Sequence, residues 1–160
     1  RAEQELAQLR KSAPASAIIE NLAAQIKSAA GQPDAALAQY QSALKSFPGH
    51  RALIYGYAEA LLQSRQSAQA LKLVNNRLRT YPGDSRLYEL QAQAYAMQGK
   101  ALLSHQAQAE AYARRGSLVA AIEQLQLGLK AGDGDFYQLS MAEARLKALR
   151  AEHAELAKKP

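Results

Sequence analysis

The sequence of 160 residues has no cysteine and no tryptophan, and it holds only two phenylalanines and two methionines. Without cysteine there can be no disulfide and no thiolate metal site, although this absence is compatible with the cytosol and the periplasm alike. No apolar run approaches the roughly 20 residues of a membrane span. Alanine, leucine and glutamine are abundant instead, and the length suffices for one helical domain with a core of its own.

Motifs that support catalysis are also missing. The three histidines, His50, His105 and His153, stand far apart, and no H-E-x-x-H pattern occurs. There is no glycine-rich phosphate loop and no nucleophile elbow. The run from Gly132 to Asp135 holds two carboxylates but lacks the further oxygen ligands of a calcium loop, so we interpret it as a turn with Asp135 as a helix N-cap. We therefore expect no catalytic residue, no metal site and no cofactor in this chain.

The chain is basic, with a formal net charge of +6. Such a balance permits binding to nucleic acid or to an anionic surface. Lysine and arginine are nevertheless scattered among acidic residues, and no stripe combines aromatic with basic side chains as in grooves that stack bases. We expect a solvated basic surface, and a helical-repeat RNA binder stays an alternative that a salt titration of binding to single-stranded nucleic acid would test.

Three prolines recur at a fixed interval, since Pro14, Pro48 and Pro82 are 34 residues apart. The segments between them carry the same pattern of small and apolar residues. This period resembles that of the tetratricopeptide repeat, a unit of two helices. Because one such unit cannot bury its apolar face alone, the resemblance implies units stacked into a solenoid, which is a binding architecture.

The repeat pattern predicts an all-α fold, a right-handed superhelix of antiparallel helix pairs with a long C-terminal capping helix. The first segment fits a second helix with Ala2, Leu6 and Leu9 inward and Pro14 at its end. The chain thus begins in mid-repeat and without methionine, so we expect it to be part of a longer protein. The predicted divisions are a solenoid over 1–135, made of the truncated repeat 1–16 and the units 16–50, 51–84 and 85–135, and a capping helix and tail over 136–160.

Small residues recur at one site of each predicted helix, where they let two helix backbones approach closely. In the repeat 51–84, for example, Ile54, Tyr57, Ala58 and Leu61 share one helical face. We expect the recurring tyrosines to fill the core beside the small residues. The small sites are Ala23, Ala58, Ala92 and Ala109 in first helices and Ala36, Ala70 and Ala121 in second helices, and the tyrosines are Tyr57, Tyr95 and Tyr112.

The spacing changes after residue 99, because Gly116 follows Gly99 by only 17 residues, half a period. We therefore expect a helix over 101–114 to serve as the partner of 85–98 and also as the first helix of the next pair. The segment from Asp135 to Leu156 predicts one long amphipathic helix. We interpret this helix as a cap on the array. The alternative is a dimerisation or docking helix, which would make the protein a homo-oligomer. Its apolar seam consists of Leu139, Ala142, Leu146, Leu149, His153 and Leu156.

In a tetratricopeptide solenoid the first helices line the concave face, which suits an extended peptide or a partner helix. Tyr55, Leu62 and Met97 are the candidate apolar anchors on this lining. Gly56 lies there too, where either an approaching partner backbone or internal packing would call for glycine. The predicted partner-binding residues are Asn21, Lys27, Tyr55, Glu59, Leu62, Arg86, Glu89, Gln93, Met97, Gln106, Glu110 and Arg114.

The lining differs from that of the family members that grip chaperone C-terminal tails. Those members carry lysine and asparagine at fixed sites of successive first helices, so we do not expect this chain to bind such tails. At one of these sites the chain has Glu20, Tyr55, Glu89 and Gln106, and at the other Ala24, Glu59, Gln93 and Glu110.

The C-terminal third has a narrower resemblance, to the end of bacterial periplasmic zinc metallopeptidases of the β-barrel assembly-enhancing protease type. In that family a last repeat leads through an Asp/Gly turn into an aromatic pair and then a helix with E-A-R. The resemblance implies an upstream protease domain that holds the zinc, periplasmic residence and docking to outer-membrane assembly components. The matching residues are Asp133, Phe136, Tyr137, Glu143, Ala144 and Arg145.

Together these patterns predict a non-catalytic protein-interaction module that recruits substrates or assembly partners for an attached periplasmic zinc metallopeptidase. We expect a protein or peptide partner in the concave groove and no small-molecule substrate. A free-standing scaffold of another cell-envelope assembly is the first alternative, and the RNA binder is the second. The sequence upstream of Arg1 separates the first two, because a zinc-protease motif is expected there only for the attached module.

Overall fold

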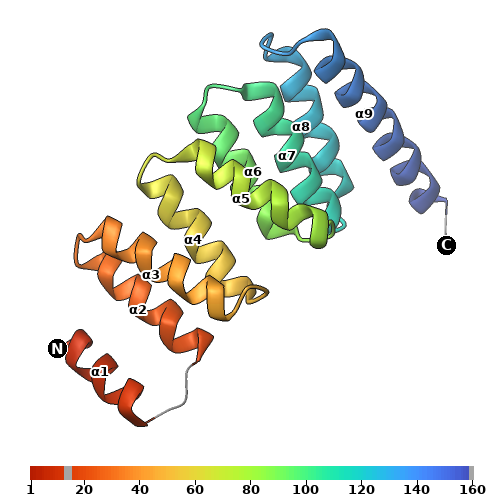
Figure 1. Ribbon diagram of the computed structural model, residues 1–160. Coiled ribbons are helices and arrows are strands. Elements are labelled where there is room, and N and C mark those ends of the chain that lie inside the picture. Colours follow the sequence, from red (N-terminus) through yellow and green to blue (C-terminus); the bar gives the residue numbers. More distant parts are fainter. Residues whose placement is uncertain (13–15, 159–160) are drawn as a thin grey trace. The chain divides into compact units, whose positions relative to one another are not determined.

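The computed structural model describes residues 1–12 and 16–158, and every regular element within these ranges is an α-helix (Figure 1). The all-α class predicted from the sequence is confirmed, in the form of a tetratricopeptide-like helical repeat. Pro14, the first of the three periodic prolines, lies outside the described residues. The helices are α1 Ala2–Ser12, α2 Ala17–Ala29, α3 Pro33–Ser46, α4 Arg51–Gln63, α5 Ser67–Thr80, α6 Ser85–Met97, α7 Ala101–Arg114, α8 Leu118–Lys130 and α9 Phe136–Ala157.

The helices fall into two compact units, residues 1–66 and residues 67–160. The division lies between α4 and α5, inside the predicted repeat 51–84. The right-handed superhelix and the division into a solenoid and a cap stay predictions from the sequence.

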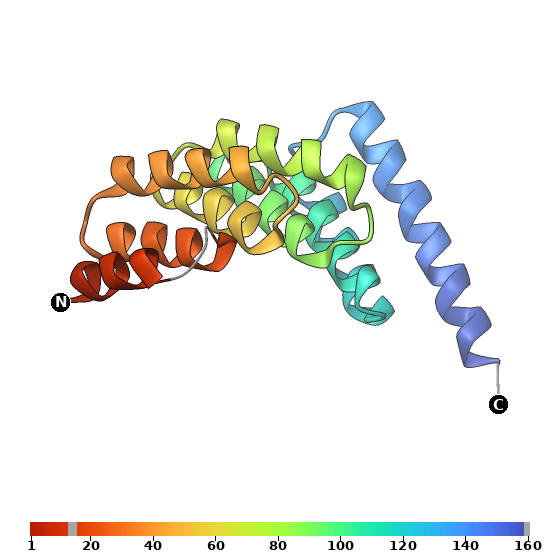
Figure 2. The same ribbon diagram turned by 60° about the horizontal axis from the view of Figure 1, so that its bottom comes forward.

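Unit 1 is built on the antiparallel pair α2 and α3, which lie side by side in Figure 2. Helix α4 packs against both of them, and α1 packs against α2. The packing of α1 buries Leu6 but leaves Ala2 exposed and Leu9 45% exposed. The expectation that all three point inward was therefore wrong for Ala2 and Leu9, since the face that α2 covers is narrower than the apolar stripe.

The small residues of the repeat lie where the sequence pattern placed them. All seven recurring alanines are buried, and none is more than 4% exposed. The tyrosines beside them, Tyr57, Tyr95 and Tyr112, are half-buried. Alanine at these sites lets the helices pack at close distance, and the tyrosine rings fill the space at their edges.

Gly56 owes its place to internal packing. A Cβ built on this residue of α4 would lie 2.6 Å from the hydroxyl and 2.8 Å from ring carbons of Tyr40 on α3. Tyr40 is only 3% exposed, and its ring lies 6.2 Å from that of Tyr57, so it cannot easily swing aside. Of the two interpretations of Gly56, the structure supports the packing one.

Unit 2 is a row of neighbouring helices in which α5 packs on α6, α6 on α7, α7 on α8 and α8 on α9. Helix α7 spans Ala101–Arg114 and packs against both α6 and α8, so the predicted double use of this helix is confirmed. Helix α9 also reaches back to α7. These contacts enclose an apolar core of Leu102, Ala109, Leu118, Ala121, Leu125, Ala142, Leu146 and Leu149.

Only the middle of the α9 seam is buried. Ala142, Leu146 and Leu149 join the core, but His153 is exposed and Leu156 is 52% exposed. The last two members of the predicted seam face a pocket that Leu118 and Val119 of α8 also line, but the core does not bury them.

The turns after α2, α4, α6 and α7 repeat one backbone geometry. Each helix is followed by a residue with positive φ, at Gly31 (73°), Arg65 (57°), Gly99 (69°) and Gly116 (79°). The first three are spaced 34 residues apart, which is the repeat period. This left-handed conformation is the usual end of a helix and favours glycine. Arg65 is therefore the glycine equivalent in its repeat.

Aspartates cap the beginnings of two helices of unit 2, α6 and α9. The carboxylate of Asp84 accepts hydrogen bonds from the backbone N–H groups of Arg86 (3.0 Å) and Leu87 (3.3 Å) at the start of α6. Asp135 forms a capping box with Gln138 on α9, which confirms the predicted N-cap. The turn before α9 also contacts α7.

Asp133 caps a helix that is distant in sequence. Its carboxylate accepts the backbone N–H groups of Ala101 (2.5 Å) and Leu102 (3.0 Å), the first residues of α7. Lys100, at the N-cap position of α7, makes no side-chain cap. The Asp/Gly turn thus joins the α8–α9 connection to the start of α7.

Candidate functional site

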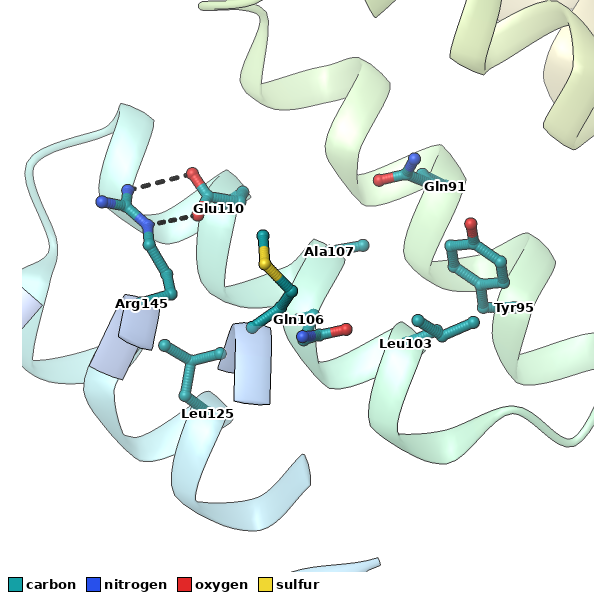
Figure 3. A pocket seen from close by; sticks show the side chains of 9 residues that line it. Gln91, Tyr95, Leu103, Gln106, Ala107, Glu110, Leu125 and Arg145 are labelled. Carbon is teal, nitrogen blue, oxygen red and sulfur yellow. Dashed lines mark hydrogen bonds and ion pairs between the residues drawn. The ribbon is translucent and has the colours of Figure 1, made fainter. Parts of the chain in front are cut away.

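Unit 2 contains a pocket of about 310 Å³ where α6, α7, α8 and α9 meet (Figure 3). We call this pocket, with its rim, the α6–α9 groove. Its volume is at the lower end of the range of ligand pockets. The lining residues are Gln91 and Tyr95 from α6, Leu103, Gln106, Ala107 and Glu110 from α7, Leu125 from α8, and Met141 and Arg145 from α9.

One side of the groove is apolar. Leu125 and Ala107 are buried, 1% and 4% exposed, and Tyr95 and Leu103 are half-buried beside them. Met141 of α9 is 53% exposed at the edge. An unbranched thioether and an aromatic ring adapt to side chains of different shapes. This side can therefore receive an apolar side chain.

The other side is an ion pair between α7 and α9. The Arg145 guanidinium donates from Nε to Oε1 of Glu110 at 2.5 Å and from Nη2 to Oε2 at 3.1 Å (Figure 3). Arg114 brings its Nη2 within 3.3 Å of the same carboxylate. Hydrogen bonding to Glu110, above all, raises the pKa of Arg145 despite partial burial. The pair fixes α9 against α7.

Two glutamine amides complete the lining. Gln91 donates to Oδ1 of Asn75 at 2.7 Å, and Gln106 donates to the backbone oxygen of Gln138 at 3.3 Å. Both bonds use the NH₂ group. Each amide also has an oxygen with two lone pairs, which is the acceptor needed for a backbone N–H of an extended segment.

A second ion-pair cluster lies near the groove, at the beginning of α6 and the end of α7. Glu89 pairs with Arg86 at 2.8 Å and also with Arg115. Burial works to raise the pKa of Glu89, but the hydrogen bonds and charges of the two arginines outweigh it, and this pKa lies below its ordinary value. Arg114 stands over the ring of Tyr88, 5.6 Å from its centroid, as in a cation–π contact.

Some of the predicted partner-binding residues belong to this region. Gln106 and Glu110 line the groove, and Arg114 contacts Glu110. Arg86 and Glu89 belong to the second cluster. Gln93 and Met97 are exposed on α6 and are not among the residues that line the groove.

The predicted residues of unit 1 lie in a different setting. Lys27 donates to Oε1 of Gln39 at 2.6 Å, and Gln39 in turn donates to Glu20, so these polar groups tie α2 to α3. Asn21 and Tyr55 are half-buried. Glu59 lies with Tyr40, Gly56 and Gln63 around a smaller pocket of about 140 Å³, whose members are Gln25, Ser28, Tyr40, Gly56, Glu59, Ala60 and Gln63.

Leu62 is the predicted anchor that the structure contradicts. It is only 7% exposed, so it contributes to the protein interior and offers no open apolar contact. The sequence argument assumed one buried stripe on α4. Because α4 packs against both α2 and α3, its buried face is wider and includes Ala60 and Leu62 as well as Ala58 and Leu61.

The sequence argument missed most of the groove. Tyr95 was interpreted as core packing. Met141 and Arg145 were not predicted as pocket residues, because the argument for α9 considered only its one apolar seam and named Arg145 only as part of the E-A-R resemblance. A signal was available, since Tyr137, Met141 and Arg145 follow one another at intervals of four residues and so share a second face of α9.

None of the helices in the described ranges combines the length and the apolarity needed to cross a membrane. Among residues 1–12 and 16–158, no three histidine, aspartate or glutamate side chains come together in a way that could hold a metal ion.

The helical pairs, the alanine contacts and the period of the turns are similar to those of a known repeat family. Residues 28–94 match the tetratricopeptide repeat family model. The match extends from the end of α2 to α6 and supports a tetratricopeptide repeat domain. Tetratricopeptide repeats generally mediate protein–protein interactions without catalysis of their own. No curated protein matches the chain.

Proposed function

We propose that the chain is a non-catalytic interaction module that binds a segment of a partner protein in the α6–α9 groove. The observation that carries this proposal is the meeting of an apolar floor with hydrogen-bonding groups from several helices in one pocket. An extended peptide needs both features, because its side chains seek apolar contacts and its backbone seeks hydrogen bonds.

The predicted lining of unit 1 is proposed as a partner-binding surface of that unit alone. Asn21, Lys27, Tyr55 and Glu59 would supply its polar contacts. In unit 2, where both residues are exposed on α6, Gln93 would add a polar contact and Met97 an apolar one. Leu62 is left out of this surface because it is buried.

The groove can be tested by partner capture. We expect Leu103→Arg, which places a charge on the apolar side, to reduce the amount of partner retained by the immobilised protein. Leu127→Arg on α8, where the leucine is 50% exposed and outside the groove lining, should leave capture unchanged. Both variants are first compared with the wild type by circular dichroism. Equal capture by all three folded proteins would contradict the proposal.

We further propose that the module serves an attached periplasmic zinc metallopeptidase by recruiting its substrates or outer-membrane assembly partners. The support comes from the residues at the C-terminal end. Phe136 is 86% exposed and Tyr137 is 72% exposed at the start of α9. Two large aromatic side chains in open solvent are typical of a contact surface for another domain or protein.

This finer proposal has a simple test. The coding sequence upstream of Arg1 should contain an H-E-x-x-H motif on a predicted helix, and the full-length protein should retain zinc after extensive dialysis. An upstream region that consists only of further helical repeats would favour the alternative, a free-standing scaffold of another cell-envelope assembly.

A further inference from the structure

Unit 1 contains a buried hydroxyl that has no hydrogen-bond partner. Tyr40 of α3 is only 3% exposed, and within the described part of the chain its hydroxyl neither donates nor accepts a hydrogen bond. The hydroxyl lies beside Gly56 of α4, and both residues line the small pocket of about 140 Å³ in this unit. Because a buried polar group without a partner is unfavourable and rare, this hydroxyl indicates a group that enters the pocket and bonds to it.

The Tyr40 hydroxyl keeps its proton at neutral pH. Burial raises the pKa of Tyr40, and the negative charge of Glu59 raises this pKa further. The group is therefore a neutral O–H that can donate one hydrogen bond, and its missing partner is an acceptor. Lysine and arginine side chains have no acceptor atom, so a cationic side chain does not satisfy this donor.

The other polar groups of the pocket restrict the ligand further. The described residues that line it include the carboxylate of Glu59 but no lysine or arginine, so an anionic group would meet a like charge. Gln25 and Gln63 are exposed at the pocket and present amide groups. A carboxylate has about four lone-pair sites, so Glu59 can accept from a ligand in addition to its existing partners. The lining thus suits an uncharged group that both accepts and donates hydrogen bonds.

We propose that this pocket of unit 1 binds the side-chain amide of an asparagine or glutamine in a partner segment. The amide oxygen would accept from the Tyr40 hydroxyl, and the amide NH₂ group would donate to Glu59 or to the oxygen of Gln25. A pocket of about 140 Å³ is well below the size of a drug-like ligand site and suits one short side chain. This inference rests on the proposed partner-binding surface of unit 1, to which Glu59 belongs, and adds the class of side chain that this surface recognises.

A purely structural role of the hydroxyl makes a different prediction. If the fold needed this group, Tyr40→Phe would lower the melting temperature. We expect an unchanged or slightly higher melting temperature instead, because the ring stays and a polar group without a partner is removed. Tyr57→Phe is the matched control, since its ring lies 6.2 Å from that of Tyr40 but its hydroxyl already accepts from Gln41 and does not line the pocket.

The experiment is a selection from a phage-displayed library of short random peptides. Phage that bind the immobilised Tyr40→Phe chain are removed first, so that the wild type then enriches only peptides that depend on the hydroxyl. We expect these peptides to share an asparagine or glutamine at one position. The best peptide is then synthesised with this residue and with leucine in its place. Fluorescence anisotropy should show about tenfold weaker binding of the leucine peptide to the wild type and to Tyr57→Phe, the size of one lost hydrogen bond in a buried site. For Tyr40→Phe the two peptides should bind almost equally.

The outcomes separate this inference from the proposal it rests on. If the enriched peptides share a charged residue, or no residue at all, in place of the amide, the class of side chain is wrong. If prior removal on Tyr40→Phe leaves no binders, water alone satisfies the hydroxyl and the inference fails. Peptides that lose binding to Leu103→Arg but not to Tyr40→Phe would show that the α6–α9 groove binds peptides without the pocket of unit 1. If the wild type enriches nothing even without this prior removal, the peptide-binding function and the inference both fail.

Discussion

Arg65 shows how a single residue can depart from its repeat without changing the fold. It has a φ of 57° at a position where the neighbouring repeats carry Gly31 and Gly99. A residue with a Cβ is strained in this region by roughly 1–2 kcal/mol. The turn is nevertheless kept, because the backbone N–H groups of Arg65 and Gln66 donate to the carbonyl oxygens of Leu62 (2.9 Å) and Leu61 (2.8 Å) at the end of α4.

We expect Arg65→Gly to stabilise the protein by about 1 kcal/mol, because glycine relieves the strain at positive φ. The exposed Arg65 side chain leaves no packing to lose. The measurement is the shift in the midpoint of urea unfolding. Gly99→Ala is the matched control and should lower stability by a similar amount. A loss of stability in Arg65→Gly would mean that the arginine side chain is needed in the turn.

At Gly56 the constraint is packing and not backbone strain, since its backbone is helical and only the neighbouring ring of Tyr40 excludes a side chain. We expect Gly56→Ala to destabilise unit 1 by about 1–3 kcal/mol through overpacking against Tyr40, although alanine is the better helix former. Thermal unfolding followed by circular dichroism measures this effect.

Two further variants test whether the Tyr40 ring causes the destabilisation by Gly56→Ala. The cost of Gly56→Ala should fall when Tyr40→Leu makes room, which a double-mutant cycle would show as coupling. Gly83→Ala, where a Cβ meets open space, should change stability by less than about 0.5 kcal/mol. An alanine at position 56 that raised stability would refute the packing account.

At the scale of elements, the helices of unit 2 depend on contacts from outside their own sequence. Helix α7 has no cap of its own and receives one from Asp133, which follows α8. It also supplies Glu110 to the ion pair with Arg145 of α9, and Arg115, directly after its last residue, pairs with Glu89 of α6. Helix α7, which is the partner of both α6 and α8, therefore also carries the polar side of the groove.

We expect Asp133→Ala to cost about 0.5–2 kcal/mol, the usual value of a lost N-cap. Backbone amide exchange at Ala101 and Leu102 should accelerate, because their N–H groups lose their acceptor. Exchange at Arg86 and Leu87, which Asp84 caps, is the internal control and should not change. Unaltered exchange at Ala101 and Leu102 would show that Asp133 is not their acceptor in solution.

The contact between α6 and α7 should depend on pH through Glu89. Its pKa is lowered in the folded protein, so the ionised carboxylate contributes stability above the pKa of the unfolded chain, and this contribution is lost as the pH falls through the folded pKa. We expect the stability difference between the wild type and Glu89→Gln to shrink from about pH 6 to about pH 3. Urea unfolding at a series of pH values measures it, and a constant difference would contradict the assignment.

At the scale of the whole molecule, the sequence predicted the helices well because the turns that end them recur at a fixed period. The break after α4, the double role of α7 and the buried alanines all followed from spacing. The groove could not be predicted from spacing, because it needs residues of α9 beside residues of α6. No local sequence pattern shows which face of α9 lies toward α6. The prediction that Leu62 is an open apolar anchor was wrong for a related reason, since a periodic stripe does not reveal how many neighbours a helix has.

The α6–α9 groove is the proposed place at which a partner protein binds. Site-specific photo-crosslinking tests it most directly, with a photoreactive phenylalanine derivative placed at Gln106 in the groove or at Leu127 on α8, each in the full-length protein in its own cells. We predict covalent adducts with a partner from position 106 and none from position 127. Adducts from position 127 alone, or equally from both positions, would contradict the claim.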